Sequence, residues 1–74
     1  MSHDTDQLNH LIKMVNQIAA NQPVELIGEE AAVNAVAGHI QKFWAPPMRE
    51  RIGHYLAEGG EKLSLVAKKA VERI

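Results

Sequence analysis

The sequence contains no cysteine, which excludes disulfides, thiolate zinc sites, cysteine-ligated iron–sulfur clusters and thiol nucleophiles. Aromatic bulk is also scarce, because the 74 residues include only one Trp, one Tyr and one Phe. A chain of this length buries only about 60% of the surface that its unfolded form exposes. Folds this small commonly need a disulfide, a metal or an association partner. With disulfides excluded, the sequence favours one small core that is supported by association.

The sequence also lacks long apolar runs and basic runs. No apolar stretch approaches the roughly 18 residues that cross a bilayer, and the first residues have neither the basic start nor the apolar stretch of a signal peptide. Eight Lys and Arg stand against nine Asp and Glu, for a net charge of −1. This balance argues against nucleic acid as a partner. We therefore expect a cytoplasmic chain with neither a membrane nor a nucleic acid as its partner.

Apolar residues recur at helical spacing along most of the chain, which predicts an all-α fold. We expect a single domain, residues 1–74, that forms a small bundle of three to four short amphipathic helices. Residues 1–5 are expected to be disordered, and residues 23–28 to form a connector. The expected helices span about residues 5–21, 29–44, 47–58 and 64–73.

Prolines, glycines and caps set these helix boundaries. The residue before Pro23 avoids helical dihedrals, and Pro47 suits the first turn of the third expected helix. The pair Gly59-Gly60 predicts a left-handed cap at the end of that helix. Ser64 is a candidate N-cap for the last helix, with Leu63 packing just before it.

The second expected helix has two contrasting faces. Its predicted buried stripe consists of Val33, Val36, Ala37, Ile40, Phe43 and Trp44. A second stripe contains only the small residues Ala31, Ala35 and Gly38, where a helix in a two-layer fold would normally be charged. The favoured interpretation is that a neighbouring helix of the same chain covers this face, and the alternative is a partner's backbone.

The sequence shows no arrangement typical of catalysis or metal binding. Neither Ser2 nor Ser64 lies in a pattern resembling Gly-x-Ser-x-Gly, and the carboxylate pair Glu29-Glu30 suits a helix start for dipole reasons alone. No two histidines are three or four residues apart on one helix, so partly exposed structural roles are favoured for His3, His10, His39 and His54. We predict no catalytic, metal-binding or cofactor-binding residues, no cofactor, and no enzymatic activity.

The stretch from Gly38 to Ile52 concentrates the chain's most distinctive chemistry at one corner between two expected helices. Trp, Phe, Met and Arg are the residue types enriched in interface cores. Burial in the core is favoured for Phe43, whereas burial and partner contact stay equally open for Trp44, Arg49 and Arg51. The predicted partner-interface residues are His39, Lys42, Phe43, Trp44, Pro46, Met48, Arg49 and Arg51.

Several segments also carry a family resemblance. The first expected helix contains Asn16-Gln17-Ile18-Ala19, and the run from His39 to Arg49 reads His-Ile-x-Lys-Phe-Trp-x-Pro-x-Met-Arg. In these residues the chain resembles the delta subunit of bacterial NAD-dependent formate dehydrogenases, over nearly its whole length after Leu8. The family pattern at the corner reads Phe-Trp-Asp-Pro-Arg-Met-Arg, so Ala45 stands in place of the Asp and Pro47 in place of the first Arg.

This resemblance implies a non-catalytic accessory subunit of a soluble molybdenum- or tungsten-dependent complex. Such a subunit would dock on the larger catalytic subunit and support assembly, stability or insertion of the molybdenum cofactor, with the redox groups in other subunits. Two other hypotheses stay open. One is a self-associating helical adaptor or regulatory domain, and the other is a small ligand- or metal-binding bundle. The isolated chain could then be a homodimer.

Overall fold

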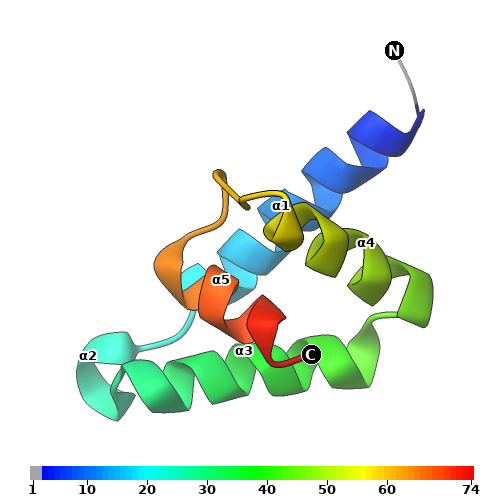
Figure 1. Cartoon of the computed structure of the whole chain (residues 1–74). Coiled ribbons are helices and arrows are strands. Elements are labelled where there is room, and N and C mark those ends of the chain that lie inside the picture. Colours follow the sequence, from blue (N-terminus) through cyan, green and yellow to red (C-terminus); the bar gives the residue numbers. More distant parts are fainter. Residues whose placement is uncertain (1–2) are drawn as a thin grey trace.

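The computed structural model describes the chain from His3 to Ile74, with side chains from Asp6 onward. This part of the chain forms helices and no strand, so the all-α prediction is confirmed. Figure 1 shows α3 running along one side of the molecule, with α5 against it and with α1 and α4 on the α5 side. The helices are α1 (His3–Ala20), α2 (Val24–Ile27), α3 (Glu29–Phe43), α4 (Pro46–Ala57) and α5 (Leu65–Glu72).

The bounds of α1, α3, α4 and α5 lie within two residues of the four expected helices. The expected disorder of residues 1–5 concerns two residues outside the described part and residues 3–5, whose backbone forms the first turn of α1. The expectation that residues 23–28 form only a connector is corrected, because this segment contains the single helical turn α2. The Pro23 carbonyl accepts from the Ile27 N–H at 3.0 Å, and the Gly28 N–H donates to the Val24 carbonyl at 2.8 Å. Gly28 lies between α2 and α3 and has a φ of 88°, a non-helical value that glycine tolerates.

One aliphatic core lies between α1, α3, α4 and α5. Burying a Val, Leu or Ile side chain contributes about 1.5–3 kcal/mol, so a few such residues decide whether a chain this small folds. Trp44 is only 4% exposed and extends the core to the end of α3. The largest fully buried side chains are Leu11, Val15, Val33, Val36, Ile40 and Ile52.

Phe43 does not belong to this core, which corrects the favoured interpretation of its position. Its side chain is 65% exposed, whereas the adjacent Trp44 is buried. The backbone N–H of Trp44 still donates to the Ile40 carbonyl at 2.9 Å, but the backbone of Trp44 is already extended, with φ −88° and ψ 136°. Because α3 ends at Phe43, no further turn follows to cover that ring.

The structure also corrects the interpretation that a neighbouring helix of the chain covers the small-residue face of α3. Ala31, Ala35 and Gly38 are all exposed, so no other described helix of the chain covers them. A Cβ atom placed on Gly38 would have no neighbouring heavy atom within 4 Å. This face is therefore open to solvent in the isolated chain.

The predicted caps at both ends of the loop between α4 and α5 are confirmed. The Gly60 N–H donates to the Tyr55 carbonyl at 3.1 Å and the Gly59 N–H to the Leu56 carbonyl at 2.9 Å, the pair of bonds that defines a Schellman cap. Gly60 has a positive φ of 56°. At the other end, the Ser64 hydroxyl accepts from the Ala67 N–H at 3.3 Å and caps α5.

Candidate docking surface

Backbone geometry fixes the corner between α3 and α4. Trp44 and Ala45 are both extended, and Ala45 is the residue before Pro46, a position that disfavours helical dihedrals. Pro46 and Pro47 then occupy the first two positions of α4, where their missing N–H groups cost nothing. Two fixed φ angles make this corner stiff, and α4 leaves it to pack against α5 and α1.

The outer side of the corner carries an exposed aromatic and cationic cluster. The centroids of the His39 and Phe43 rings lie 4.8 Å apart, with 48° between their planes. The Lys42 ammonium nitrogen lies 5.9 Å from the Phe43 centroid, within cation–π range. We call His39, Lys42 and Phe43 the corner cluster. It presents a large aromatic ring, a residue type that is enriched in interface cores, with a lysine ammonium group beside it.

The inner side of the corner is more buried. Met48 is half-buried and packs against the core, and Trp44 is almost fully buried. Arg49 and Arg51 are half-buried, and Arg51 is already engaged in an interaction. The indole Nε1 of Trp44 and the Nε of Arg49 are buried N–H donors without a hydrogen-bond acceptor.

The predicted interface residues are therefore divided between surface and interior. His39, Lys42, Phe43 and Pro46 are exposed and come together at the end of α3 and the start of α4. Trp44 is separated from them because it points into the core. These placements leave the interface prediction as a prediction, and they identify which of its members can touch another molecule without unfolding.

Comparison with known proteins agrees with the sequence resemblance. A family model described as the NADH-dependent formate dehydrogenase delta subunit, FdsD, matches residues 10–71. The chain belongs to this delta subunit family. The match runs from α1 into α5 and includes the whole corner. The resemblance stated from the sequence is thereby confirmed, and no curated protein or solved structure shows a comparable match.

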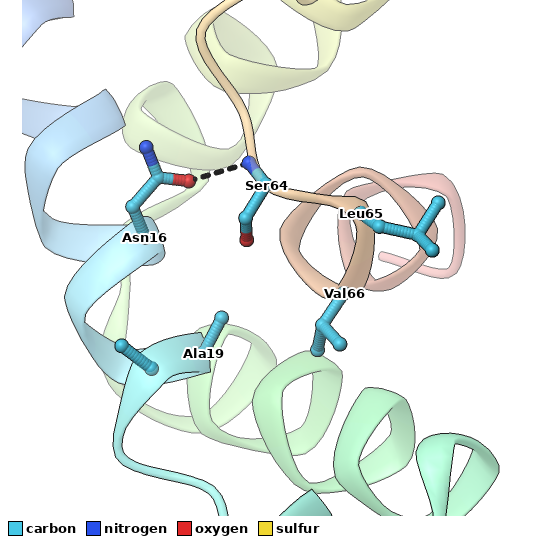
Figure 2. A pocket seen from close by; sticks show the side chains of 6 residues that line it. Asn16, Ala19, Ser64, Leu65 and Val66 are labelled. Carbon is cyan, nitrogen blue, oxygen red and sulfur yellow. Dashed lines mark hydrogen bonds between the residues drawn. The ribbon is translucent and has the colours of Figure 1, made fainter.

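This member of the delta subunit family also has a hollow of about 260 Å³ between the end of α1 and the start of α5. Figure 2 shows Asn16 and Ala19 on one side of it and Ser64 and Val66 on the other. The Asn16 Oδ1 accepts from the Ser64 N–H at 2.9 Å, so the polar groups of this hollow serve the loop and the α5 cap. What remains at its rim is apolar, and Leu65 is 61% exposed there.

Two further exposed apolar side chains escaped the sequence reasoning. Leu26 is 86% exposed and Ile27 is 44% exposed, both on α2. They lie in the segment expected to be a connector. Two adjacent large apolar residues in a connector were the one sequence signal that could have indicated an exposed apolar patch.

The described part of the delta subunit chain offers no metal centre and no membrane span. Within residues 6–74, whose side chains are described, no group of three His, Asp or Glu side chains is placed to hold a metal ion. None of the described helices is long and apolar enough to cross a bilayer.

Proposed function

We propose that this chain is a non-catalytic accessory subunit that docks through the α3–α4 corner onto the catalytic subunit of a soluble, cytoplasmic, molybdenum- or tungsten-dependent formate dehydrogenase. Membership of the delta subunit family supports a place in a formate dehydrogenase complex, and the corner cluster supports the α3–α4 corner as the docking surface. The observation that carries the proposal is Phe43, a large apolar ring held 65% exposed on a stiff corner. Docking would aid assembly, stability or insertion of the molybdenum cofactor.

The energetics favour Phe43 as an anchor. Fully burying a Phe side chain contributes about 1.5–3 kcal/mol, so covering the exposed two-thirds of this ring contributes about 1–2 kcal/mol. The His39 ring and the Lys42 ammonium group already lie beside this ring and limit its motion. Because little side-chain freedom remains to be lost, more of the burial energy is retained as affinity.

The corner alone is too small for a stable interface. A standard interface buries about 800 Å² of each partner, roughly one-sixth of this chain's 4836 Å² accessible surface. The exposed small-residue face of α3 adjoins the corner cluster and would allow a partner helix to approach closely. We infer that the interface continues from Phe43 along Gly38, Ala35 and Ala31.

A second candidate function is self-association without formate dehydrogenase. The observation that favours it is that four large apolar side chains are exposed among residues 6–74, which are Leu26, Ile27, Phe43 and Leu65. Light scattering separates the two candidates. A stable homodimer that protects Phe43 would support self-association, whereas a monomer that binds a catalytic subunit supports the accessory role.

The test is copurification of tagged full-length chain with the catalytic subunit, comparing wild type with Phe43→Ala and Leu26→Ala. Leu26 is the matched control because it is also highly exposed and lies on α2, which precedes α3, whereas Phe43 is the last residue of α3, a helix roughly 20 Å long. We expect Phe43→Ala to weaken binding by about tenfold or more and Leu26→Ala to leave it unchanged. Wild-type chain that never recovers a molybdenum-dependent catalytic subunit would refute the accessory role, and equal binding by all three chains would refute the corner.

A further inference from the structure

We propose that two copies of this chain pair antiparallel along the exposed face of α3, so that α2 of each copy meets the corner cluster of the other. The inference goes beyond the proposed function, because it concerns the chain before it meets a catalytic subunit. It also differs from the stable homodimer of the second candidate function, since this pairing is weak and reversible. The occupant of the face in the free chain is a second copy of the same chain.

Exposed apolar side chains lie at both ends of α3. At its N-terminal end, α2 carries Leu26, which is 86% exposed, and Ile27, and no residue of α2 is buried. At its C-terminal end, the Phe43 ring is 65% exposed. Figure 1 shows α2 and the corner at opposite ends of α3. A second copy presents apolar groups at that same separation, so an antiparallel pair covers both ends of both copies.

The surface between these ends allows two helices to approach closely. Ala31, Ala35 and Gly38 are exposed, and their spacing of four and three residues places them on one face of α3. No heavy atom lies within 4 Å of the position that a Cβ on Gly38 would take. These small residues permit a close approach of the two helix axes, and the apolar side chains at the ends supply the attraction.

The charges at the two ends favour the antiparallel orientation. Glu25 on α2 is exposed, and α3 begins with Glu29 and Glu30, which already pair with cations of the same chain. Lys42 is the cation beside Phe43 at the other end. An antiparallel pair brings Glu25 of each copy to the end where the other copy carries Lys42, and it opposes the two α3 dipoles. A parallel pair would place like charges together at both ends.

The size of the face sets the strength of the pairing. Helix α3 has 15 residues, a length of about 22 Å, and only one side of it would be covered together with α2 and the corner. A standard interface involves about 20–30 residues of each partner. This face is smaller, so we expect a dissociation constant of about 10 µM to 1 mM.

The first experiment measures self-association of the isolated full chain by light scattering between about 10 µM and 1 mM. The variants are Leu26→Ala and Phe43→Ala, with Leu65→Ala as the control that shortens a 61% exposed side chain on α5. Circular dichroism of each variant confirms that it is folded.

We expect Leu26→Ala and Phe43→Ala each to raise the dissociation constant about tenfold or more, because every dimer loses the contact twice. Leu65→Ala should associate as wild type does. An equal loss in Leu65→Ala would overturn the proposal, because association would then be non-specific. Wild-type chain that is monomeric at about 1 mM would also overturn it and would leave the face to another protein.

The absence of cysteine from the chain allows the orientation to be tested with single-cysteine variants. With Ala31 opposite Gly38 of the second copy, the two-fold axis passes beside Ala35. The two Ala35 Cα atoms are then offset by about 1.5 Å along the helices, whereas the two Ala31 Cα atoms are offset by about 10 Å. A disulfide requires Cα atoms within about 7 Å of each other.

We therefore expect Ala35→Cys to form a covalent dimer on mild oxidation. Ala31→Cys should not cross-link with itself but should cross-link with Gly38→Cys in a mixture of the two. Equal cross-linking of Ala31→Cys and Ala35→Cys with themselves would indicate a parallel pair and overturn the proposal, as would the absence of any cross-link in Ala35→Cys.

The pairing covers Phe43, so it excludes docking through the corner, a consequence that rests on the proposed function. Light scattering of wild-type chain mixed with the catalytic subunit should show one copy of this chain in each complex, and a bound intact pair would overturn the exclusion. The two proposals fail separately. If the chain does not bind the catalytic subunit, the proposed function fails, and the isolated chain still decides the pairing.

Discussion

Replacing Asn16 with Ala should destabilise the fold, because this side chain joins α1 to the loop that precedes α5. Its Nδ2 donates to the Lys62 carbonyl at 2.8 Å, and its Oδ1 accepts from the Ser64 N–H at 2.9 Å. These are contacts across 46 and 48 residues of sequence. Both are long-range, so Asn16 fixes where the chain turns into its last helix.

The expected magnitude follows from the number and setting of these bonds. Each contributes about 0.5–1.5 kcal/mol, and the lower half of that range applies because both bonds are solvent-exposed. The predicted loss is about 1–2 kcal/mol. A fold of this size rarely has more than about 3–5 kcal/mol in total, so the loss should lower the thermal midpoint by roughly 5–15 °C.

The assay is urea unfolding followed by circular dichroism, with Asn9→Ala as the control. Asn9 is an exposed residue of the same helix, and its replacement gains the same helix propensity without removing a long-range bond. Subtracting that gain isolates the loop contact. The reasoning is refuted if Asn16→Ala is not at least about 0.5 kcal/mol less stable than Asn9→Ala.

Three other predictions concern single positions, and a fourth concerns the histidines. Gly60→Ala should destabilise by about 1 kcal/mol or more in urea unfolding, because φ is 56° and the new Cβ would lie 2.9 Å from Leu56 Cδ1; unchanged stability would contradict the cap. Ser64→Ala should cost about 1 kcal/mol by the same measurement through loss of the α5 cap, and Ser64→Asp should restore most of it. Ile52→Val should cost about 0.5–1.5 kcal/mol, because Ile52 is fully buried; no measurable loss would mean that α4 is not packed as described. Titration with zinc in a calorimeter should give no binding heat, because the three histidines with described side chains lie on three different helices, and saturable heat at a 1:1 ratio would revive the metal-binding hypothesis.

Sequence periodicity predicted the helices well because each helix buries one stripe. Leu11 and Val15, or Val36 and Ile40, are four residues apart, and that spacing places both members of a pair on one face of any helix. The caps were equally readable, since Gly60 and Ser64 satisfy the backbone groups next to them in the chain. Local chemistry of this kind does not depend on where the other helices lie.

The sequence could not predict that Trp44 is buried and Phe43 exposed, because this depends on how the helices are arranged. By helical count both residues lie near the buried stripe of α3. Which one is covered depends on where the helix ends and how the next one leaves, and the extended backbone of Trp44 settles this by directing the indole inward. The bonds of Asn16 to Lys62 and Ser64 were likewise invisible, because nothing in an Asn-Gln-Ile-Ala run indicates a partner in a loop near the other end of the chain.

The candidate surface was predictable in composition but not in which members are accessible. Proline and aromatic residues marked the corner, yet the pairing state of each cation depends on tertiary contacts. Arg73 is tied to α3 through Glu30 and Asn34, whereas Arg49 has no such partner. Only the three-dimensional structure distinguishes a cation that pairs within the fold from one that does not.

The corner between α3 and α4 contributes one residue to the core and one to the surface, because Trp44 is buried and the adjacent Phe43 is exposed. Trp44 closes the core at the point where α3 ends, and this closure holds the adjacent ring outside. A fold with about 3–5 kcal/mol of stability gains about 2.7 kcal/mol when a partner is present at a hundred times its dissociation constant. Docking would then stabilise the chain by an amount comparable to its own folding free energy. Because the proposed docking residue Phe43 and the core residue Trp44 are adjacent in the chain, a partner that covered Phe43 would also restrain the backbone that keeps Trp44 in place. An accessory subunit of this size would accordingly be most stable within its complex, if its corner is the docking surface proposed above.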